Sequence, residues 1–503
     1  GTRNTASADY SFIGGGKTNE LRSGNGVLVG GSSNLVCANG NVTLVGGCLN
    51  IASGCCTFLG GGNRNKTEGQ QSVLVGGYNN TGSGNCSFIG GGNKNIVNSG
   101  LSAVVGGSNN TASAEWSFIG GGICNLTVSG YSSAIVGGTN NTASGACSFI
   151  GGGYLNKAIG AHSVIAGGYT NFAAGCSVVG GGCENTASAL VAVIAGGQRN
   201  TASANYSSIG GGFSNWTQAC QSTIGGGCDN RINASGTHGT IAGGQENYVN
   251  NIGGTVGGGE LNCAYGAYDT IVGGCGNYIG QNSSTTTTSG WNTVGGRLNC
   301  ITGPGNVCYN TLFGCNNRVY CNSSFNFAGG FNNCFGSQTS ISCATNYSAI
   351  FGFNNKICAN YGFIAGGYGN SIQSGHQNSA ILGTYNKSST ASKTTYMCNV
   401  CAFGSLTKAS GTFKIDHPNP CKTSTHNLQH SFVESPTAGD NIYRFKIEIG
   451  DKLKGEIILP KYYKYLNTDS QVWVNPVDNL GRAFGVVNSK DTKVNITTSE
   501  PGN

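Results

Sequence analysis

Cysteine is the most reactive residue type in this chain, which contains 23 cysteines among 503 residues. Two sets recur at fixed places in a repeated pattern: Cys86, Cys147 and Cys176 stand just before a serine, and Cys48, Cys183, Cys228 and Cys275 stand just after a glycine run. If neighbouring repeats stack about 4.8 Å apart, equivalent cysteines in adjacent repeats would lie within disulfide distance. We favour small buried thiols for most cysteines and leave disulfides open for some, within or between chains. Cys398-x-x-Cys401 has no second pair, so no zinc site is expected.

Carboxylates are the next residues that could perform chemistry. A glycan hydrolase needs two of them roughly 5–9.5 Å apart. Acidic side chains are sparse before residue 411, at Glu20, Glu68, Glu115, Glu184, Glu246 and Glu260 among others. Glu246 and Glu260 stand about one repeat apart and could approach each other, but isolated solvated charges explain the set better. We therefore expect no enzymatic activity and no cofactor.

One cluster of possible metal ligands lies near the C-terminal end, where Asp416, His417, His426, His430 and Glu434 fall within nineteen residues. Three chains could gather His426, His430 and Glu434 around an axis as a metal site. Polar groups at proline-containing turns are the interpretation we prefer.

Glycine runs invite two further hypotheses, and both fail on the residues. A calcium-binding β-roll needs an aspartate in each repeat, whereas aspartate occurs in very few, at Asp9, Asp229 and Asp269. A phosphate loop needs a Gly-Lys-Ser/Thr sequence, which does not follow the glycines. We assign the glycines and the asparagine that closes each repeat to tight turns. The clearest sets are Gly14, Gly15, Gly16 and Asn19; Gly90, Gly91, Gly92 and Asn95; and Gly120, Gly121, Gly122 and Asn125.

The elements that carry these residues are set by a repeat of about fifteen residues. Segments such as Asn4–Asn19, Asn110–Asn125 and Asn141–Asn156 are nearly identical. Fifteen residues suit one coil of two short strands and two bends, so the sequence predicts an all-β, glycine-rich parallel β-solenoid or β-roll. In the strand motif Ser87-Phe88-Ile89 we expect Ser and Ile on opposite faces. Closing asparagines are expected to be left-handed and to stack into ladders.

Coils with three glycines mostly alternate with coils with two, so the structural unit is expected to be a pair of coils. Each coil supplies only two or three apolar side chains, such as Val27, Leu28 and Val29. We expect neighbouring chains to complete so thin a core, most simply in a homotrimer.

Three regions are expected: regular solenoid over 1–280, an irregular Cys-rich continuation with longer loops over 281–410, and a small C-terminal β domain over 411–503. Charged residues mark the last boundary, because 24 lie in 1–410 and 21 in the far shorter 411–503. Within the tail, strands are predicted at 443–449, 455–459, 471–474 and 482–487. Without a Lys/Arg cluster or a long apolar run, we expect neither nucleic-acid binding nor membrane insertion.

Longer spacings after residue 280 suggest where a ligand could bind. A Ser/Thr stretch, 283–289, precedes Trp291. Loops on a solenoid usually emerge on one face, which is often the binding face. Trp291, Tyr309 and Tyr320 are the candidate receptor-binding residues.

The coil Asn-Thr-Ala-Ser-Gly-x-x-Ser-x-Ile-Gly-Gly-Gly resembles the head repeats of trimeric autotransporter adhesins and the shaft repeats of some phage and large-virus fibres, over about residues 1–390. It differs in having fifteen rather than fourteen residues and many cysteines. The tail segments GTFKIDHPNP, LQHSFVESP and NIYRFK are similar to a module near the C-terminus of phage and viral fibre proteins. The resemblance implies a trimeric virion tail fibre that binds a glycan or protein of the host surface. A microbial surface adhesin or extracellular filament remains the alternative, followed by a spike-type glycan-degrading enzyme.

Overall fold

The chain forms two compact units, Gly1–Asn399 and Val400–Asn503. The computed structural model describes residues 1–280, 289–303, 307–320, 322–337 and 344–397 in the first unit. In the second it describes residues 412–416, 427–431, 445–461, 463, 472–475, 482–488 and 492–501. Every element assigned in these residues is a β-strand.

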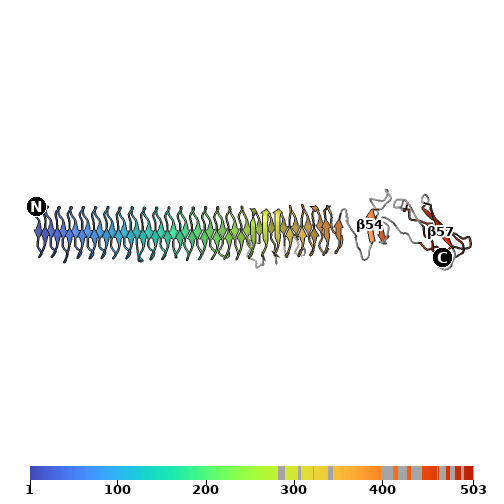
Figure 1. The fold of residues 1–503 in the computed structure, drawn as a ribbon, viewed down its shortest axis with the longest axis horizontal. Coiled ribbons are helices and arrows are strands. Elements are labelled where there is room, and N and C mark those ends of the chain that lie inside the picture. The colour runs from blue at the N-terminus through green and yellow to red at the C-terminus, as the bar shows by residue number, and fades with distance from the viewer. Residues whose placement is uncertain are drawn as a thin grey trace. The chain divides into compact units, whose positions relative to one another are not determined.

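The first unit is a parallel β-solenoid, as the fifteen-residue repeat predicted (Figure 1). Each coil contributes one strand to each of two sheets. Sheet A contains β2 (Phe12–Ile13), β4 (Val27–Leu28), β12 (Phe88–Ile89) and their equivalents, and sheet B contains 24 strands that include β1 (Thr5–Ala6), β3 (Glu20–Leu21) and β13 (Ile96–Val97). Neighbouring strands pair in parallel, and β12 and β14 (Ala103–Val104) do so without a shift, with Phe88 opposite Ala103 and Ile89 opposite Val104. Later strands lengthen, notably β36 (Thr270–Cys275), β39 (Thr293–Arg297) and β42 (Thr311–Cys315).

Side chains alternate between the inside and the outside of each coil. Ser87 and Ile89 are both buried, and Phe88 between them is exposed. The expectation that Ser and Ile lie on opposite faces is therefore wrong, because residues two apart in a strand share a face.

The apolar core is closed within a single chain. Ile89, Val97, Val104 and Ala112 follow one another along the stack, and none has any exposed surface. Only one residue of the predicted Val27-Leu28-Val29 set is fully buried: Leu28 has no exposed surface, whereas Val29 is 48% exposed. The argument that a neighbouring chain must complete the core is thus wrong, because one inward residue per strand, apolar in most strands, suffices when the coils stack directly.

A ladder of buried asparagines runs beside this core. Asn95 donates from Nδ2 to Gly91 O at 2.9 Å and to Gly107 O at 3.0 Å, and its Oδ1 accepts the Asn110 N–H at 3.0 Å. The same bonds recur from coil to coil, so each amide fastens its own glycine turn to the next coil.

The left-handed residue at this turn is the one before the ladder asparagine, and the expectation that Asn itself is left-handed is wrong. Thr18, Lys94 and Cys124 have φ of 53°, 54° and 56°. Among the predicted turn glycines, Gly16, Gly92 and Gly122 have φ of 91°, 92° and 93°, and Gly91 has φ of 154°. Gly14, Gly15, Gly90, Gly120 and Gly121 lie outside the left-handed region.

The second unit contains two antiparallel sheets. β54 (Thr412–Asp416) pairs with β55 (Asn427–Ser431), and β58 (Lys493–Thr498) lies between β56 (Lys454–Ile458) and β57 (Ala483–Asn488). β56 and β57 match two predicted strands, whereas β58 was not predicted. The described residues 445–449 and 472–474 form no strand, so those two predictions are wrong there. Ile447, Val472 and Val474 instead pack against a small core that includes Ile449 and Val494.

Replacing Asn95 by Ala should lower the free energy of unfolding by about 1–3 kcal/mol, because the buried Asn110 N–H loses its acceptor. Chemical denaturation would measure the change. Asn93→Ala is the matched control, since Asn93 is exposed in the same turn and should change stability by less than about 0.5 kcal/mol. Equal losses in the two variants would contradict the role given to the ladder.

Gly92→Ala should also destabilise the solenoid, by on the order of 1–3 kcal/mol. A Cβ there would meet Gly107 O at 2.2 Å in a left-handed backbone. Gly106→Ala is the control, because a Cβ at Gly106 meets open space and its φ is not positive. We expect the melting temperature to fall only for Gly92→Ala, and a fall of the same size for Gly106→Ala would count against the prediction.

Candidate functional site: an aromatic corner

The two corners of each coil tolerate insertions differently. We call the corner from sheet A to the next sheet B strand, such as 90–95, the glycine corner, and the opposite one the variable corner. Across the glycine corner, successive buried residues stay seven or eight positions apart, as in Val104 to Ala112 and Leu312 to Val319. Across the variable corner the interval reaches fifteen positions, from Ile279 to Val294 and from Phe335 to Ile350. The asparagine ladder fixes the glycine corner, so the extra residues of the longer coils fall in the sequence of the variable corner.

The variable corner also carries a stack of aromatic rings. Six rings follow one another on consecutive coils: Tyr268, Trp291, Tyr309, Phe325, Tyr347 and Tyr361. Successive ring centroids lie 5.1, 5.5, 4.8, 4.8 and 5.4 Å apart, with planes within 17° of parallel. Each residue is left-handed and about half exposed, so the ring points outward at the bend. We call these six residues the aromatic ladder.

The structure places two of the three predicted receptor-binding residues together. Trp291 and Tyr309 are neighbours in the aromatic ladder. Tyr320 is elsewhere: it follows a sheet B strand, is 8% exposed, and its hydroxyl accepts a hydrogen bond from Arg318 Nη1 at 3.2 Å. That hydrogen bond raises the pKa of Arg318.

Sequence reasoning missed Tyr268, Phe325, Tyr347 and Tyr361. A signal was present, because Trp291, Tyr309 and Phe325 are each followed by asparagine. Those asparagines are buried and form a second ladder, in which Asn310 N bonds to Asn292 Oδ1 at 2.9 Å and Asn326 N bonds to Asn310 Oδ1 at 3.1 Å. An aromatic residue directly before an inward asparagine thus marks the corner.

Stacking limits how this ladder can meet a ligand. The flat faces of the inner rings are covered by their neighbours at about 5 Å. Tyr268 lies over Gly253, where an added Cβ would come within 2.4 Å of the Tyr268 ring. The ladder therefore offers ring edges and tyrosine hydroxyls along a line, rather than one open face on which a single sugar could stack.

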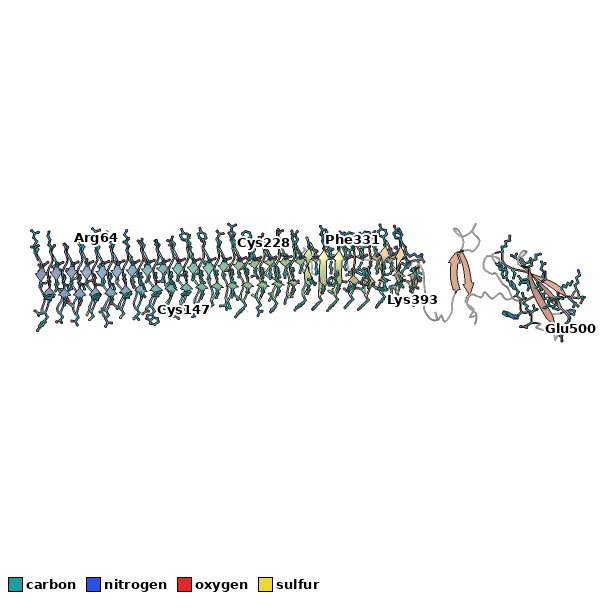
Figure 2. All side chains as sticks on the ribbon, turned by 45° about the horizontal axis from the view of Figure 1, so that its top comes forward. Arg64, Cys147, Cys228, Phe331, Lys393 and Glu500 are labelled. Carbon is teal, nitrogen blue, oxygen red and sulfur yellow. The ribbon has the colours of Figure 1, made fainter. Side chains whose placement is uncertain are left out.

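A shorter aromatic stack occupies the glycine corner over part of the same stretch. It comprises Phe331, Phe353, Tyr368 and Tyr385, with centroids 5.0, 5.1 and 5.1 Å apart. Figure 2 shows Phe331 projecting from the same edge as Arg64 and Cys228, and Cys147 from the opposite edge. The two aromatic stacks therefore lie on different edges of the solenoid.

The described cysteines are surface groups, so the expectation of small buried thiols is wrong for them. Seventeen of the described cysteines are exposed or half-buried. The two recurrent sets lie at different corners. The variable corner holds Cys86, Cys147 and Cys176, and the glycine corner holds Cys48, Cys183, Cys228 and Cys275. Cys334, in sheet B, is only partly exposed, and this partial burial raises the pKa of its thiol to about 11. Cys358 forms a disulfide bond.

Glu246 and Glu260, which stand about one repeat apart in the sequence, do not share a position in the stack. Glu260 pairs with Gln245 and Cys275, whereas Glu246 accepts a hydrogen bond from Gln245 Nε2 at 3.0 Å.

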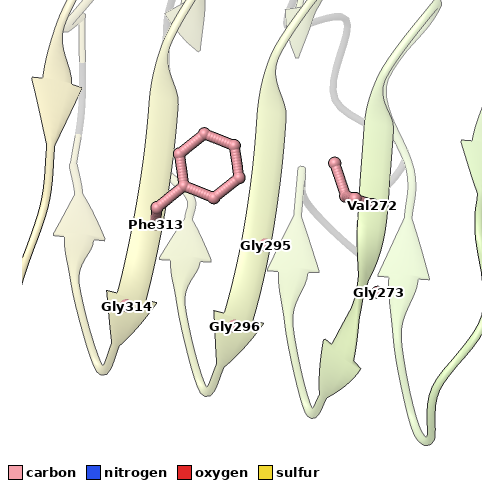
Figure 3. Close-up of a pocket in the computed structure, with 6 residues that line it drawn as sticks. All are labelled: Val272, Gly273, Gly295, Gly296, Phe313 and Gly314. Carbon is pink, nitrogen blue, oxygen red and sulfur yellow. The ribbon is translucent and has the colours of Figure 1, made fainter.

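A shallow depression of about 280 Å³ lies on sheet A, lined by Val272, Gly273, Gly295, Gly296, Phe313 and Gly314 (Figure 3). It exists because Gly295 has no side chain between Val272 and Phe313, and its lining contains no titratable group.

No three His, Cys, Asp or Glu side chains gather as metal ligands in the part of the chain that the structure describes. Of the predicted metal candidates, His430 lies in β55 opposite Phe413, and His426 and Glu434 fall outside the described residues, as do Cys398 and Cys401. Among the residues described, no helix has the length and apolar character to cross a membrane.

Comparison with known proteins gives no assignment: no family model matches the chain, and no curated protein matches it.

Asp269 begins the second asparagine ladder and makes it sensitive to pH. Its Oδ1 accepts the Asn292 N–H at 3.1 Å and Nδ2 at 3.0 Å, whereas the buried Oδ2 has no hydrogen-bond partner among the described residues. Burial raises the pKa of Asp269 to about 6, against the opposing effect of the bonds from Asn292. The folded state therefore favours the protonated acid, and its contribution to stability is present near pH 4 and lost as pH rises through 6.

Asp269→Asn should remove this loss, since a neutral amide continues the ladder. We expect the variant to gain on the order of 2–3 kcal/mol in unfolding free energy at pH 8 and little at pH 4. Denaturant titration at both pH values would measure it. Asp229→Asn, an exposed change of the same charge at the glycine corner, is the control. A gain of equal size at pH 4 and pH 8 would contradict the assignment.

Proposed function

We propose that this chain is a structural and adhesive fibre protein, in which a rigid solenoid presents its variable corner to a host surface. The observation that carries the proposal is the coincidence of two features at one corner of one segment. The longest connections of the solenoid and the aromatic ladder both occur between Tyr268 and Tyr361.

The scaffold suits such a role mechanically. Every coil is tied to the next by the same backbone bonds and the same buried amide, so the stack has no natural hinge over Gly1–Tyr278. Stability of a stack of this kind adds up from coil to coil, and its length can change without a change of core. These properties fit a shaft better than an enzyme, whose chemistry needs converging titratable groups in a cavity.

The variable corner suits attachment. Exposed aromatic residues are enriched in binding surfaces because they bring a large contact area with few rotatable bonds. A row of ring edges and hydroxyls about 5 Å apart fits an extended chain-like ligand, such as a glycan or a protein segment of a host surface. With the resemblance to viral fibre repeats, the proposal is a virion fibre that attaches to its host there.

Binding of the full chain to a glycan array and to intact cells, with and without protease treatment, tests the proposal. Replacing Tyr309 and Tyr347 by Ser should weaken binding at least tenfold, because it removes two rungs of the aromatic ladder. The matched control is Phe353→Ser with Tyr368→Ser, which removes two stacked rings from the glycine corner. Equal losses in the two double variants would contradict attachment through the variable corner.

A further inference from the structure

The outer face of sheet A is unusual for a surface because it lacks charge. Each coil exposes two positions there, equivalent to Phe88 and Gly90. Throughout the described solenoid none of these positions holds a charged side chain. The outer face of sheet B differs, since it carries ion pairs such as Glu20–Arg22 and Lys66–Glu68.

Large apolar side chains are most frequent on the first half of that face, from β2 to β26 (Val193–Ile194), and fewer are exposed later, such as Phe313, Phe327 and Phe363. Its exposed members are Phe12, Val29, Val45, Phe58, Val75, Phe88, Val105, Phe118, Val136, Phe149 and Val178. We call these eleven residues the apolar face. Further along sheet A the equivalent position holds a row of threonines, at Thr223, Thr240, Thr255, Thr270, Thr293 and Thr311. The fold does not require the apolar residues, because the threonine coils stack in the same register.

The apolar face has a relief that repeats every two coils. In three-glycine coils the first glycine lies under a phenylalanine ring: a Cβ on Gly90 would lie 3.4 Å from Phe88 Cε1. In two-glycine coils a valine such as Val105 takes the position of that glycine. The pattern of Phe over Gly and then Val recurs from Phe58 to Phe149, about every 9.6 Å for coils 4.8 Å apart. This relief accounts for the alternation of two and three glycines in the sequence.

We propose that the apolar face packs against the same face of further copies of this chain, aligned along the solenoid axis. The inference names the partner of the proposed fibre, and so rests on that proposal. The proposed contact does not involve the core, which each chain closes by itself. It involves side chains that point away from the core.

Matching periodicity identifies a second copy as the occupant. A partner can follow the ridges of Phe and Val over many coils only if its own surface repeats at the same interval, and another copy does so along the whole face. The absence of Lys and Arg from the face disfavours anionic lipid headgroups and nucleic acid. Thirteen coils, from β2 to β26, give a strip roughly 60 Å long and 12 Å wide. Its area, on the order of 700 Å² per chain, approaches the roughly 800 Å² per partner of a stable interface.

The test is the native mass of the full chain, measured by light scattering at micromolar concentration under reducing conditions. We expect a defined multiple of the 51.0 kDa chain, three chains being the state anticipated from the sequence. Substituting Glu at Val75, Val105 and Val136 should reduce the mass to that of one chain, since these side chains are 49%, 47% and 51% exposed and a charge is tolerated only without a partner. The matched control places Glu at Thr81, Thr111 and Thr142 on the outer face of sheet B and should keep the wild-type mass.

A photoreactive phenylalanine analogue at Phe118 provides a second measurement in the otherwise unchanged chain, and should give covalent multimers on illumination. A wild-type monomer, or a multimer that survives the three charges on sheet A, would overturn the proposal. Sedimentation of a wild-type monomer with neutral phosphatidylcholine vesicles would also overturn it, in favour of a lipid surface. These readouts do not involve the variable corner, so failure of this interface and failure of host attachment are separable.

Discussion

A buried amide that must keep all of its hydrogen bonds governs this structure. Asn95 and its equivalents have essentially no exposed surface, and an unpaired amide in such a place would cost several kcal/mol. The bonds are satisfied only if the glycine turn of the same coil and that of the next lie at fixed positions. Each asparagine therefore sets the geometry of one bend and the stacking of two coils at once, and the strands of two residues need no further support.

Variation is confined to the other corner as a result. Glycines such as Gly92 and Gly107 approach so closely that a side chain at these positions would meet the backbone of the next coil, and the glycine corner keeps a nearly constant length. The variable corner has no equivalent closure, so its length differs from coil to coil and its residues differ in kind. Where a second ladder forms there, from Asp269 through Asn326, the aromatic residue before each rung stacks as well. The regular spacing of the buried ladder thus sets the regular spacing of the aromatic rings on the surface.

The sequence was sufficient for the fold because the asparagine and glycine periodicity is local and nearly invariant. The positions of individual side chains were harder to predict. Ser87 and Ile89 were assigned to opposite faces although a strand places them together, and that error hid the outward row of Phe and Val. Trp291 and Tyr309 were found through their irregular spacing, but Tyr320 was included because the sequence does not show which residue of a lengthened coil reaches the bend. Cysteines were misjudged because their small size suits a core, whereas the core positions were already taken by Asn, Ser and one aliphatic residue per strand.

Because the long connections occur at one corner only, the distance between any two of them along the solenoid is a whole number of coil spacings. The two longest connections follow Ile279 and Phe335, which lie three coils apart in sheet B and therefore roughly 14 Å from each other. Removing or adding one coil between them would change that separation by one fixed step and leave both connections intact. The distance between the two connections thus changes only in steps of one coil. Duplication or deletion of the gene segment that encodes one coil could therefore match the connections to a surface with regularly spaced epitopes.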